Sequence, residues 1–135
     1  MPKALLLYYP GVDRVNGYPS MDQFGKGYGL DSEGLQYLAK QVYPDGVATT
    51  SDDTSPMQAD LAGLPPTFVV TAGFDPLKDS QKAFVGKLEA SGVKTTLMSY
   101  PTLIHGFLQT SAYVPDADKA ATDTARAFGD FVRAK

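Results

Sequence analysis

Three short segments that are predicted to form strands, each stopped by proline or glycine, constrain the fold of this chain more than any other feature of its sequence. Runs of this length bounded by turn residues are typical of buried strands in a parallel sheet. The clearest is Thr67–Ala72, which is rich in β-branched residues. The other two are Leu5–Tyr9 and Thr95–Tyr100, and we expect the last of these strands to end at Pro101.

Helical patterns separate and follow these runs. The first helix is predicted to start at Asp31 or Ser32, either of which can cap it, and to end before Pro44. A second helix is predicted over Pro76–Ser91, and a third begins near Asp116. The third helix is expected to bury a stripe of residues at helical spacing, namely Ala121, Ala125, Phe128 and Val132.

The order of these elements predicts the fold class. Strands that alternate with helices are typical of an α/β layer with a parallel sheet and right-handed crossovers. We therefore expect about three parallel strands with flanking helices. The 135 residues fit a single domain, numbered 1–135.

Composition excludes several classes of function. The net charge of −3 argues against nucleic acid as a partner, and no apolar run approaches the ~20 residues of a membrane helix. The chain has no cysteine and one histidine, which excludes a zinc site with cysteine ligands and a His-rich metal site. No cofactor is expected. Asp52 and Asp53 are interpreted as a solvated loop. The lack of a recognisable signal segment and of cysteines favours a cytoplasmic location.

Two residues that suit acid–base chemistry follow neighbouring strands. Asp75 comes shortly after Thr67–Ala72, and His105 comes shortly after Thr95–Tyr100. Because ligands in open α/β sheets bind beyond the carboxyl ends of the strands, both residues are expected at that edge. An aspartate that accepts from Nδ1–H of the imidazole fixes its tautomer and leaves Nε2 free as a general base.

Simpler interpretations of the same residues remain open. Asp75 directly precedes Pro76, as a plain helix N-cap does. A lone histidine beside apolar residues is often a packed side chain. A metal-dependent hydrolase is disfavoured, because one histidine and scattered carboxylates make a poor zinc site. The aromatic residues Phe24, Tyr28, Phe74 and Phe107 are by default core residues, with an acyl or aromatic pocket as the sharper alternative.

An ordered set of short motifs runs through nearly the whole chain. The motifs are Leu6-Leu7-Tyr8-Tyr9-Pro10, Ser20-Met21 with Phe24, Gly27-Tyr28 and Leu30, Ser55-Pro56-Met57, Asp60-Leu61, Leu64-Pro65-Pro66, Thr71-Ala72-Gly73-Phe74-Asp75-Pro76-Leu77 with Asp79, and His105-Gly106-Phe107. Through this ordered set, and not through any one motif, the chain resembles the C-terminal part of the hormone-sensitive-lipase-like esterases, a branch of the α/β-hydrolase fold.

The resemblance implies a function and roles for particular residues. It implies a carboxylic-ester hydrolase that acts on small-molecule esters, with Asp75 as the acid and His105 as the base of a Ser-Asp-His triad. It also implies that residues from about 11 to 53 form a cap-like insertion over the site. The residues expected to contact the substrate are Phe24, Tyr28, Phe74, Ile104 and Phe107.

The sequence departs from the family pattern in one respect. It contains neither the G-x-S-x-G nucleophile motif nor an HGGG-type oxyanion motif, which such enzymes carry in their N-terminal half. We therefore expect the last three strands of a larger sheet, and an isolated chain that is inactive or nearly so. The strand Ala4–Tyr9 would then expose an edge that favours self-association or pairing with an N-terminal half.

Two other functions remain as alternatives. The chain could be a non-catalytic binding or assembly module on a truncated hydrolase fold, in which case His105→Ala would leave ligand binding largely intact. It could also be a structural remnant with no ligand.

Overall fold

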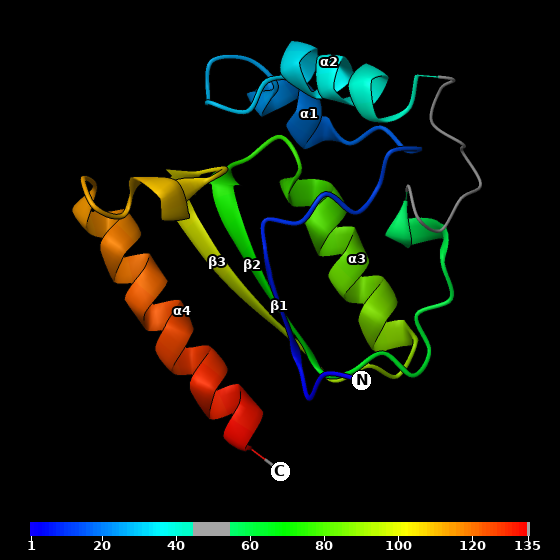
Figure 1. Ribbon diagram of the computed structural model, residues 1–135, viewed down its shortest axis with the longest axis vertical. Coiled ribbons are helices and arrows are strands. Elements are labelled where there is room, and N and C mark those ends of the chain that lie inside the picture. The colour runs from blue at the N-terminus through cyan, green and yellow to red at the C-terminus, as the bar shows by residue number, and fades with distance from the viewer. Residues whose placement is uncertain (45–54, 135) are drawn as a thin grey trace.

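A three-stranded parallel sheet forms the centre of the molecule in this computed structural model, which describes residues 1–44 and 55–134. The strands are β1 (Leu5–Tyr8), β2 (Thr67–Phe74) and β3 (Thr95–Ile104), and they pair in the order β1-β2-β3 (Figure 1). The register aligns Leu5 with Thr67 and Thr67 with Thr95. The predicted α/β class with about three parallel strands is confirmed.

The two faces of the sheet carry separate hydrophobic clusters. Helix α3 (Lys78–Ala90) covers one face, where Val69 of β2 packs with Phe84 and Leu88. Helix α4 (Pro115–Arg133) covers the other, where Phe68 packs among the residues of that helix (Figure 1). Because successive side chains of a strand point to opposite faces, one buried strand supplies both clusters.

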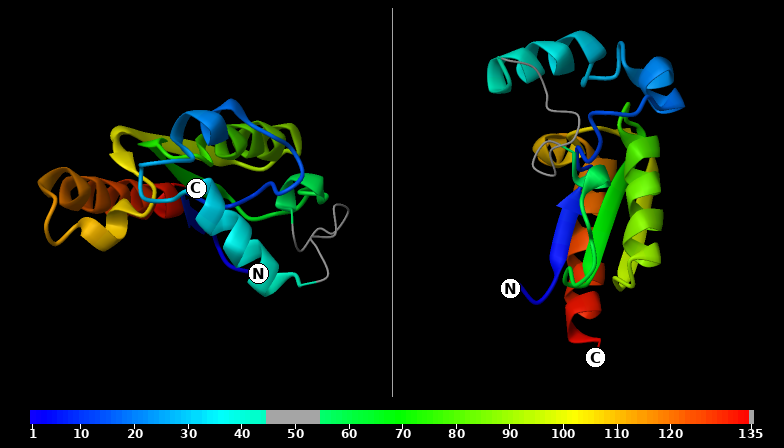
Figure 2. Two further views of the ribbon diagram at one scale, coloured as in Figure 1. Left: turned by 90° about the horizontal axis from the view of Figure 1, so that it is seen from above. Right: turned by 90° about the vertical axis from the view of Figure 1, so that its right-hand side faces the viewer.

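A layer of two short helices lies beyond the carboxyl ends of the strands. These are α1 (Pro19–Phe24) and α2 (Ser32–Val42), and both views of Figure 2 place them over that end of the sheet. Asp31 caps α2, as predicted, because its side chain accepts from the backbone N–H of Gly34. Helix α2 contains no fully buried residue. It therefore covers the sheet edge without contributing a core of its own.

The last strand is longer than the sequence predicted. It was expected to end at Pro101 but runs to Ile104. Since β3 lies at an edge of the sheet, the missing N–H of Pro101 need not remove a ladder hydrogen bond. The register between β2 and β3 shifts between Ala72 and Phe74, and a Cβ on Gly73 would lie 1.9 Å from the carbonyl oxygen of Pro101. Because glycine has no Cβ, the backbones of β2 and β3 can approach closely at this point. Strand β3 then continues to Ile104, the residue before His105.

The buried stripe of α4 also differs from the prediction. Ala125 and Val132 are exposed, whereas Ala117, Ala120 and Thr124 are buried. The hydroxyl of Tyr100 explains the shift, because it donates to the carbonyl of Ala120 and lies 2.8 Å from the hydroxyl of Thr124. Thr124 is thereby hydrogen-bonded inside the core. The spacing of apolar residues alone does not predict a buried position for a polar side chain. Of the other two predicted residues, Phe128 packs against the core and Ala121 is half-buried.

A buried serine ties the upper layer to the start of α3. Ser20 is 0% exposed, and its hydroxyl donates to the carbonyl of Pro76 at 2.8 Å and accepts from Asp79 N–H at 3.2 Å. Its own N–H donates to the Asp79 carboxylate at 3.0 Å. The contacts fix α1 to the turn that follows Asp75.

Removing this hydroxyl is expected to destabilise the fold. Ser20→Ala leaves the buried carbonyl of Pro76 and the partly buried N–H of Asp79 without their partner, at a cost of about 1–3 kcal/mol in the free energy of unfolding. Urea denaturation followed by circular dichroism measures the change. The control is Thr122→Ala on the exposed face of α4, which should not lower stability. Equal stability of Ser20→Ala and the unmodified chain would contradict this role.

Candidate active site

Two neighbouring strand ends bring Asp75 and His105 into contact. Asp75 follows directly after β2 and His105 directly after β3. The imidazole Nδ1 lies 2.9 Å from Asp75 Oδ2. The two residues therefore meet at the carboxyl edge of the sheet, as the sequence predicted from strand order.

The carboxylate of Asp75 is fully buried and held from several sides. Its exposed fraction is 0%, and its Oδ1 accepts from the backbone N–H of Leu77 at 2.8 Å. Its Oδ2 accepts from Gln81 Nε2 at 3.1 Å as well as from His105. The N-cap residue of α3 is Leu77, not Asp75. Asp75 thus satisfies a donor in the turn before α3 and orients the imidazole at the same time.

His105 stands on a tight turn that leaves part of its ring accessible. Gly106 follows it with a φ of +79°, a conformation that glycine adopts without strain, and opens the short 3₁₀ helix Phe107–Thr110. The side chain of His105 is 23% exposed. Because Asp75 can only accept when ionised, Nδ1 is assigned as the donor. Nε2 then carries the lone pair, and it makes no hydrogen bond to the described residues.

Tyr9 packs against the imidazole and was not among the predicted site residues. Its ring centroid lies 4.6 Å from that of His105, and its hydroxyl donates to Gln109 Oε1 at 3.2 Å. Tyr9 has a φ of 36°, the one positive value outside glycine in the described residues, and such strain gathers at functional sites. Burial is the main cause that raises the pKa of Tyr9, so its hydroxyl stays neutral at physiological pH. The sequence signal for a role at the site was the position of Tyr9 at the carboxyl end of the first predicted strand, directly before Pro10.

Three of the five predicted substrate-contact residues form one aromatic cluster. The rings of Tyr28 and Phe74 stack at 5.4 Å, and the ring of Phe24 lies edge-on to both at 5.2 and 5.7 Å. The ammonium of Lys78 lies 4.3 Å from the centroid of Phe24. Tyr28 and Phe74 are 36% and 37% exposed, so the cluster presents aromatic surface. It joins the upper layer to the end of β2.

The other two predicted contacts differ in exposure and in the residues around them. Ile104 is 37% exposed and approaches Gly29, where a Cβ would lie 3.6 Å from its Cδ1. Phe107 is 1% exposed and belongs to the cluster under α4, with its ring 5.5 Å from that of Tyr9. Phe107 therefore supports the turn of His105 from within the core. Its contact with a substrate stays a prediction.

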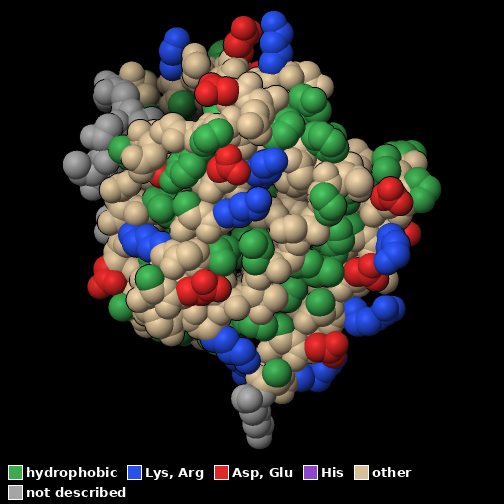
Figure 3. Space-filling view, turned by 180° about the vertical axis from the view of Figure 1, so that it is seen from behind, with side chains coloured by type: hydrophobic (Ala, Val, Ile, Leu, Met, Phe, Trp, Pro, Cys, Tyr) green, Lys and Arg blue, Asp and Glu red, His purple; other side chains and the backbone are tan. Residues whose placement is uncertain are grey.

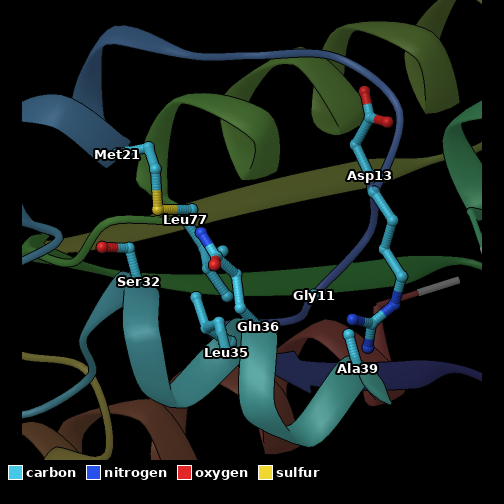
Figure 4. Close-up of a pocket in the computed structure, with 9 residues that line it drawn as sticks. Gly11, Asp13, Met21, Ser32, Leu35, Gln36, Ala39 and Leu77 are labelled. Atoms are coloured by element: carbon cyan, nitrogen blue, oxygen red, sulfur yellow. The ribbon is translucent and has the colours of Figure 1, made fainter. Parts of the chain in front are cut away.

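A cavity of about 290 Å³ lies between α2, the loop that follows β1 and the residue that precedes α3 (Figure 4). None of the five predicted contact residues lines it, whereas Phe24 and Phe74 line a second cavity of about 280 Å³. One wall of the first is Leu77, whose N–H binds Asp75. The remaining lining residues are Gly11, Asp13, Arg14, Met21, Ser32, Leu35, Gln36 and Ala39.

Asp13 organises the loop that forms the far side of this cavity. Burial tends to raise the pKa of its carboxyl group, but hydrogen bonds from Asn16, from the Val15 N–H and from Tyr18 outweigh burial and lower it to about 2. The hydroxyl of Ser55 also donates to Asp13 at 3.1 Å. The carboxylate therefore joins the loop after β1 to the segment that leads into β2.

The stability of the chain should depend on pH through this carboxylate. Since its folded pKa is below the usual 3.8, the stabilisation is present above that value and is lost as pH falls toward about 2. After discounting for solvent screening, Asp13→Asn is expected to lower the free energy of unfolding by about 1 kcal/mol at neutral pH. The measurement is urea denaturation between pH 2 and 7, with the exposed Glu89→Gln as the control. The same acid dependence in Asp13→Asn as in the unmodified chain would contradict the assignment.

The acidic side chains and the histidine of the described residues do not form a metal site. Within residues 1–44 and 55–134, no three histidine or acidic side chains gather as a metal ion requires, and no helix is long and apolar enough to cross a membrane. Acidic and basic side chains are interspersed on the face shown in Figure 3. Asp52 and Asp53 lie outside the described residues.

Comparison with known proteins gives a consistent result. A sequence profile described as alpha/beta hydrolase fold matches residues 1–109. The chain is 33% identical over 121 residues to carboxylesterase NlhH of Mycobacterium tuberculosis, a match that covers 85% of this chain and 37% of that protein. It is 35% identical over 109 residues to carboxylic ester hydrolase LipN of the same organism, covering 79% and 29%. The chain thus spans less than half the length of these curated relatives.

Solved structures share the fold over nearly the whole chain. A hyperthermophilic esterase from the archaeon Pyrobaculum calidifontis superposes with a TM-score of 0.89 at 26% identity, covering 96% of this chain and 43% of that one. An alpha/beta hydrolase enzyme from the metagenome of Lake Arreo, Spain, superposes with a TM-score of 0.84 at 34% identity, covering 95% and 42%. With the profile match over most of its length, the chain belongs to the alpha/beta hydrolase fold family.

Proposed function

We propose that this chain supplies the acid and the base of a carboxylic-ester hydrolase whose nucleophilic serine lies outside it. The observation that carries the proposal is the contact of 2.9 Å between the buried carboxylate of Asp75 and Nδ1 of the partly exposed His105. The names of the relatives, carboxylesterase and carboxylic ester hydrolase, support the choice of substrate class. No serine of this chain lies in a G-x-S-x-G motif.

The proposed mechanism assigns one proton route to the pair. The external serine oxygen attacks the ester carbonyl carbon while Nε2 of His105 takes the hydroxyl proton. The imidazolium then gives this proton to the departing alcohol oxygen, and the acyl group stays on serine. Water repeats the sequence and releases the acid. Asp75 keeps Nδ1 protonated and stabilises the imidazolium throughout.

The upper layer is the proposed cap of this site. We assign the insertion to residues from about 11 to 53, of which 45–53 lie outside the described residues. Helices α1 and α2 support this assignment because they lie beyond the carboxyl ends of the strands (Figure 1). The exposed aromatic cluster of Phe24, Tyr28 and Phe74, together with Ile104, is the proposed apolar contact for the acyl group.

The free side of β1 is the proposed contact for a partner. Leu5 and Tyr9 donate their N–H groups to the carbonyls of Pro66 and Val70. The alternation of a strand therefore points the N–H groups of Leu6 and Tyr8 away from β2. In the part of the chain that the structure describes, no strand pairs with β1 on that side. Such an edge favours pairing with another chain, either a second copy or the serine-bearing segment.

Light scattering after size exclusion tests this edge. We expect the isolated chain to self-associate at micromolar concentration, because the unpaired edge Ala4–Tyr9 can accept another strand. A stable monomer over this range would contradict self-association.

The function is tested by supplying the missing serine. The joined enzyme is a chimera in which this chain replaces the matching region of carboxylesterase NlhH. We expect the joined enzyme to hydrolyse p-nitrophenyl butyrate and the isolated chain to have no measurable turnover. Folded joined enzyme without turnover would count against the proposal, as would turnover by the isolated chain. If small esters bind the isolated chain equally well with and without His105→Ala, while the joined enzyme stays inactive, the binding-module alternative would be favoured.

A further inference from the structure

Gln81 makes a buried contact with the proposed acid that the mechanism above does not use. It lies in the first turn of α3 and its exposed fraction is 0%. Its Nε2 donates to Asp75 Oδ2 at 3.1 Å, and the same oxygen accepts from His105 Nδ1 at 2.9 Å. The amide therefore shares its acceptor with the imidazole.

The orientation of the Gln81 amide follows from the chemistry of its partner. An ionised carboxylate can only accept, so the NH₂ group and not the carbonyl must face Asp75. This choice leaves the carbonyl oxygen Oε1 buried with no hydrogen-bond partner in the described residues. Leaving a buried acceptor unpaired is unfavourable.

Packing alone does not explain an amide at this position. Gln81 lies on the inward face of α3, where Ser80, Phe84, Val85 and Leu88 are also buried. An unbranched apolar side chain such as methionine would fill the same space without an unpaired oxygen. The polar contact that distinguishes glutamine from such a residue is the one with Asp75.

Both oxygens of Asp75 are fixed by groups of one short segment. The N–H of Leu77 binds Oδ1 at 2.8 Å, and Gln81 binds Oδ2. With both bonds in place, rotation of the carboxylate plane would break at least one of them. Without Gln81, only the flexible imidazole itself would remain on Oδ2.

We propose that Gln81 is a positioning residue, which holds the carboxylate of Asp75 so that the imidazole of His105 keeps its Nε2 toward the external serine. The catalytic consequence rests on the proposed function. The geometry rests on contacts within this chain alone.

The test substitutes Gln81→Met in the joined enzyme and in the isolated chain. In the joined enzyme, kcat for p-nitrophenyl butyrate should fall about tenfold with KM unchanged, as expected for loss of a hydrogen bond to a charged group. In the isolated chain, proton NMR should show the His105 Nδ1–H signal lost to exchange with water. Stability should not fall, because the unpaired oxygen is removed with the donor. The matched control is Gln41→Met, an exposed glutamine of α2.

An unchanged kcat together with an unchanged Nδ1–H signal in Gln81→Met would overturn the positioning role. If that variant does not fold, the unmodified chain decides. A nuclear Overhauser effect is expected there between a Gln81 amide proton and the His105 Nδ1 proton, since both point at one oxygen, and its absence would overturn the proposal. If the joined enzyme has no turnover while the NMR results hold, the proposed function fails and the positioning role stands.

Discussion

Replacing His105 with alanine in the joined enzyme is expected to lower kcat for p-nitrophenyl butyrate by about 10⁶-fold. The loss is this large because the imidazole takes the serine proton in one half of the reaction and returns it to the leaving group. Without it, the serine hydroxyl stays protonated and the alcohol departs without a proton. KM should change little, since the proposed apolar contacts with the acyl group are untouched. Steady-state kinetics with active-site titration of the serine measures both values.

The exposed Arg126 of α4 offers the matched control. Arg126→Ala removes a side chain of similar size far from the sheet edge and should leave kcat and KM as they are. Turnover by His105→Ala within tenfold of the unmodified joined enzyme would mean that another base performs the reaction.

Replacing Asp75 with asparagine is expected to cost about 10⁴-fold in kcat. The shape of the side chain is kept, but its NH₂ group or its carbonyl must now face the imidazole. Where the NH₂ group faces it, His105 carries its proton on Nε2 and cannot accept from serine. Gln81 would also face an amide in place of a carboxylate. The NH₂ group of Gln81 and Nδ1–H of His105 would then compete for the single carbonyl oxygen of the asparagine.

Ring NMR of the same variant separates a wrong tautomer from a wrong fold. At neutral pH, His105 labelled with ¹⁵N should hold its proton on Nδ1 in the unmodified chain and on Nε2 in Asp75→Asn. Asp79→Asn serves as the control, because Asp79 binds Ser20 and not the imidazole. If Asp75→Asn keeps the proton on Nδ1 and keeps full turnover, Asp75 does not orient the base.

The meeting of Asp75 and His105 was predictable because parallel strands fix the side on which their ends lie. Each residue follows a segment that the sequence predicts as a strand, and neighbouring parallel strands end at the same edge. No contact had to be known in detail. Strand order and chain direction were sufficient to place both residues.

The supporting residues were not predictable on the same grounds. Gln81 occupies an inward position of α3 where apolar spacing favours a hydrophobic residue, and its partner depends on how the turn after Asp75 closes. A polar residue on an apolar helix face was the one available signal. Thr124 of α4 was missed for the same reason, because its partner in the core is the hydroxyl of Tyr100, which comes from another element. Long-range polar pairs of this kind leave no periodic trace in a sequence.

The five predicted substrate contacts do not gather in one cluster, and the reason is related. Phe24, Tyr28 and Phe74 come from separate segments that meet only once the upper layer folds over the sheet edge. Phe107 is close to His105 in sequence, but the glycine turn between them sends it into the core. Nearness in sequence to His105 therefore does not decide which of these side chains are exposed.

The most direct test of the account is intact-mass analysis of the joined enzyme after treatment with a fluorophosphonate probe. The account predicts one adduct per molecule on a serine that carboxylesterase NlhH contributes, a labelling rate that collapses in His105→Ala, and no adduct on the isolated chain. An adduct on any serine of this chain, or labelling that is equally fast without His105, would contradict the claim that the chain supplies the acid and the base to an external nucleophile.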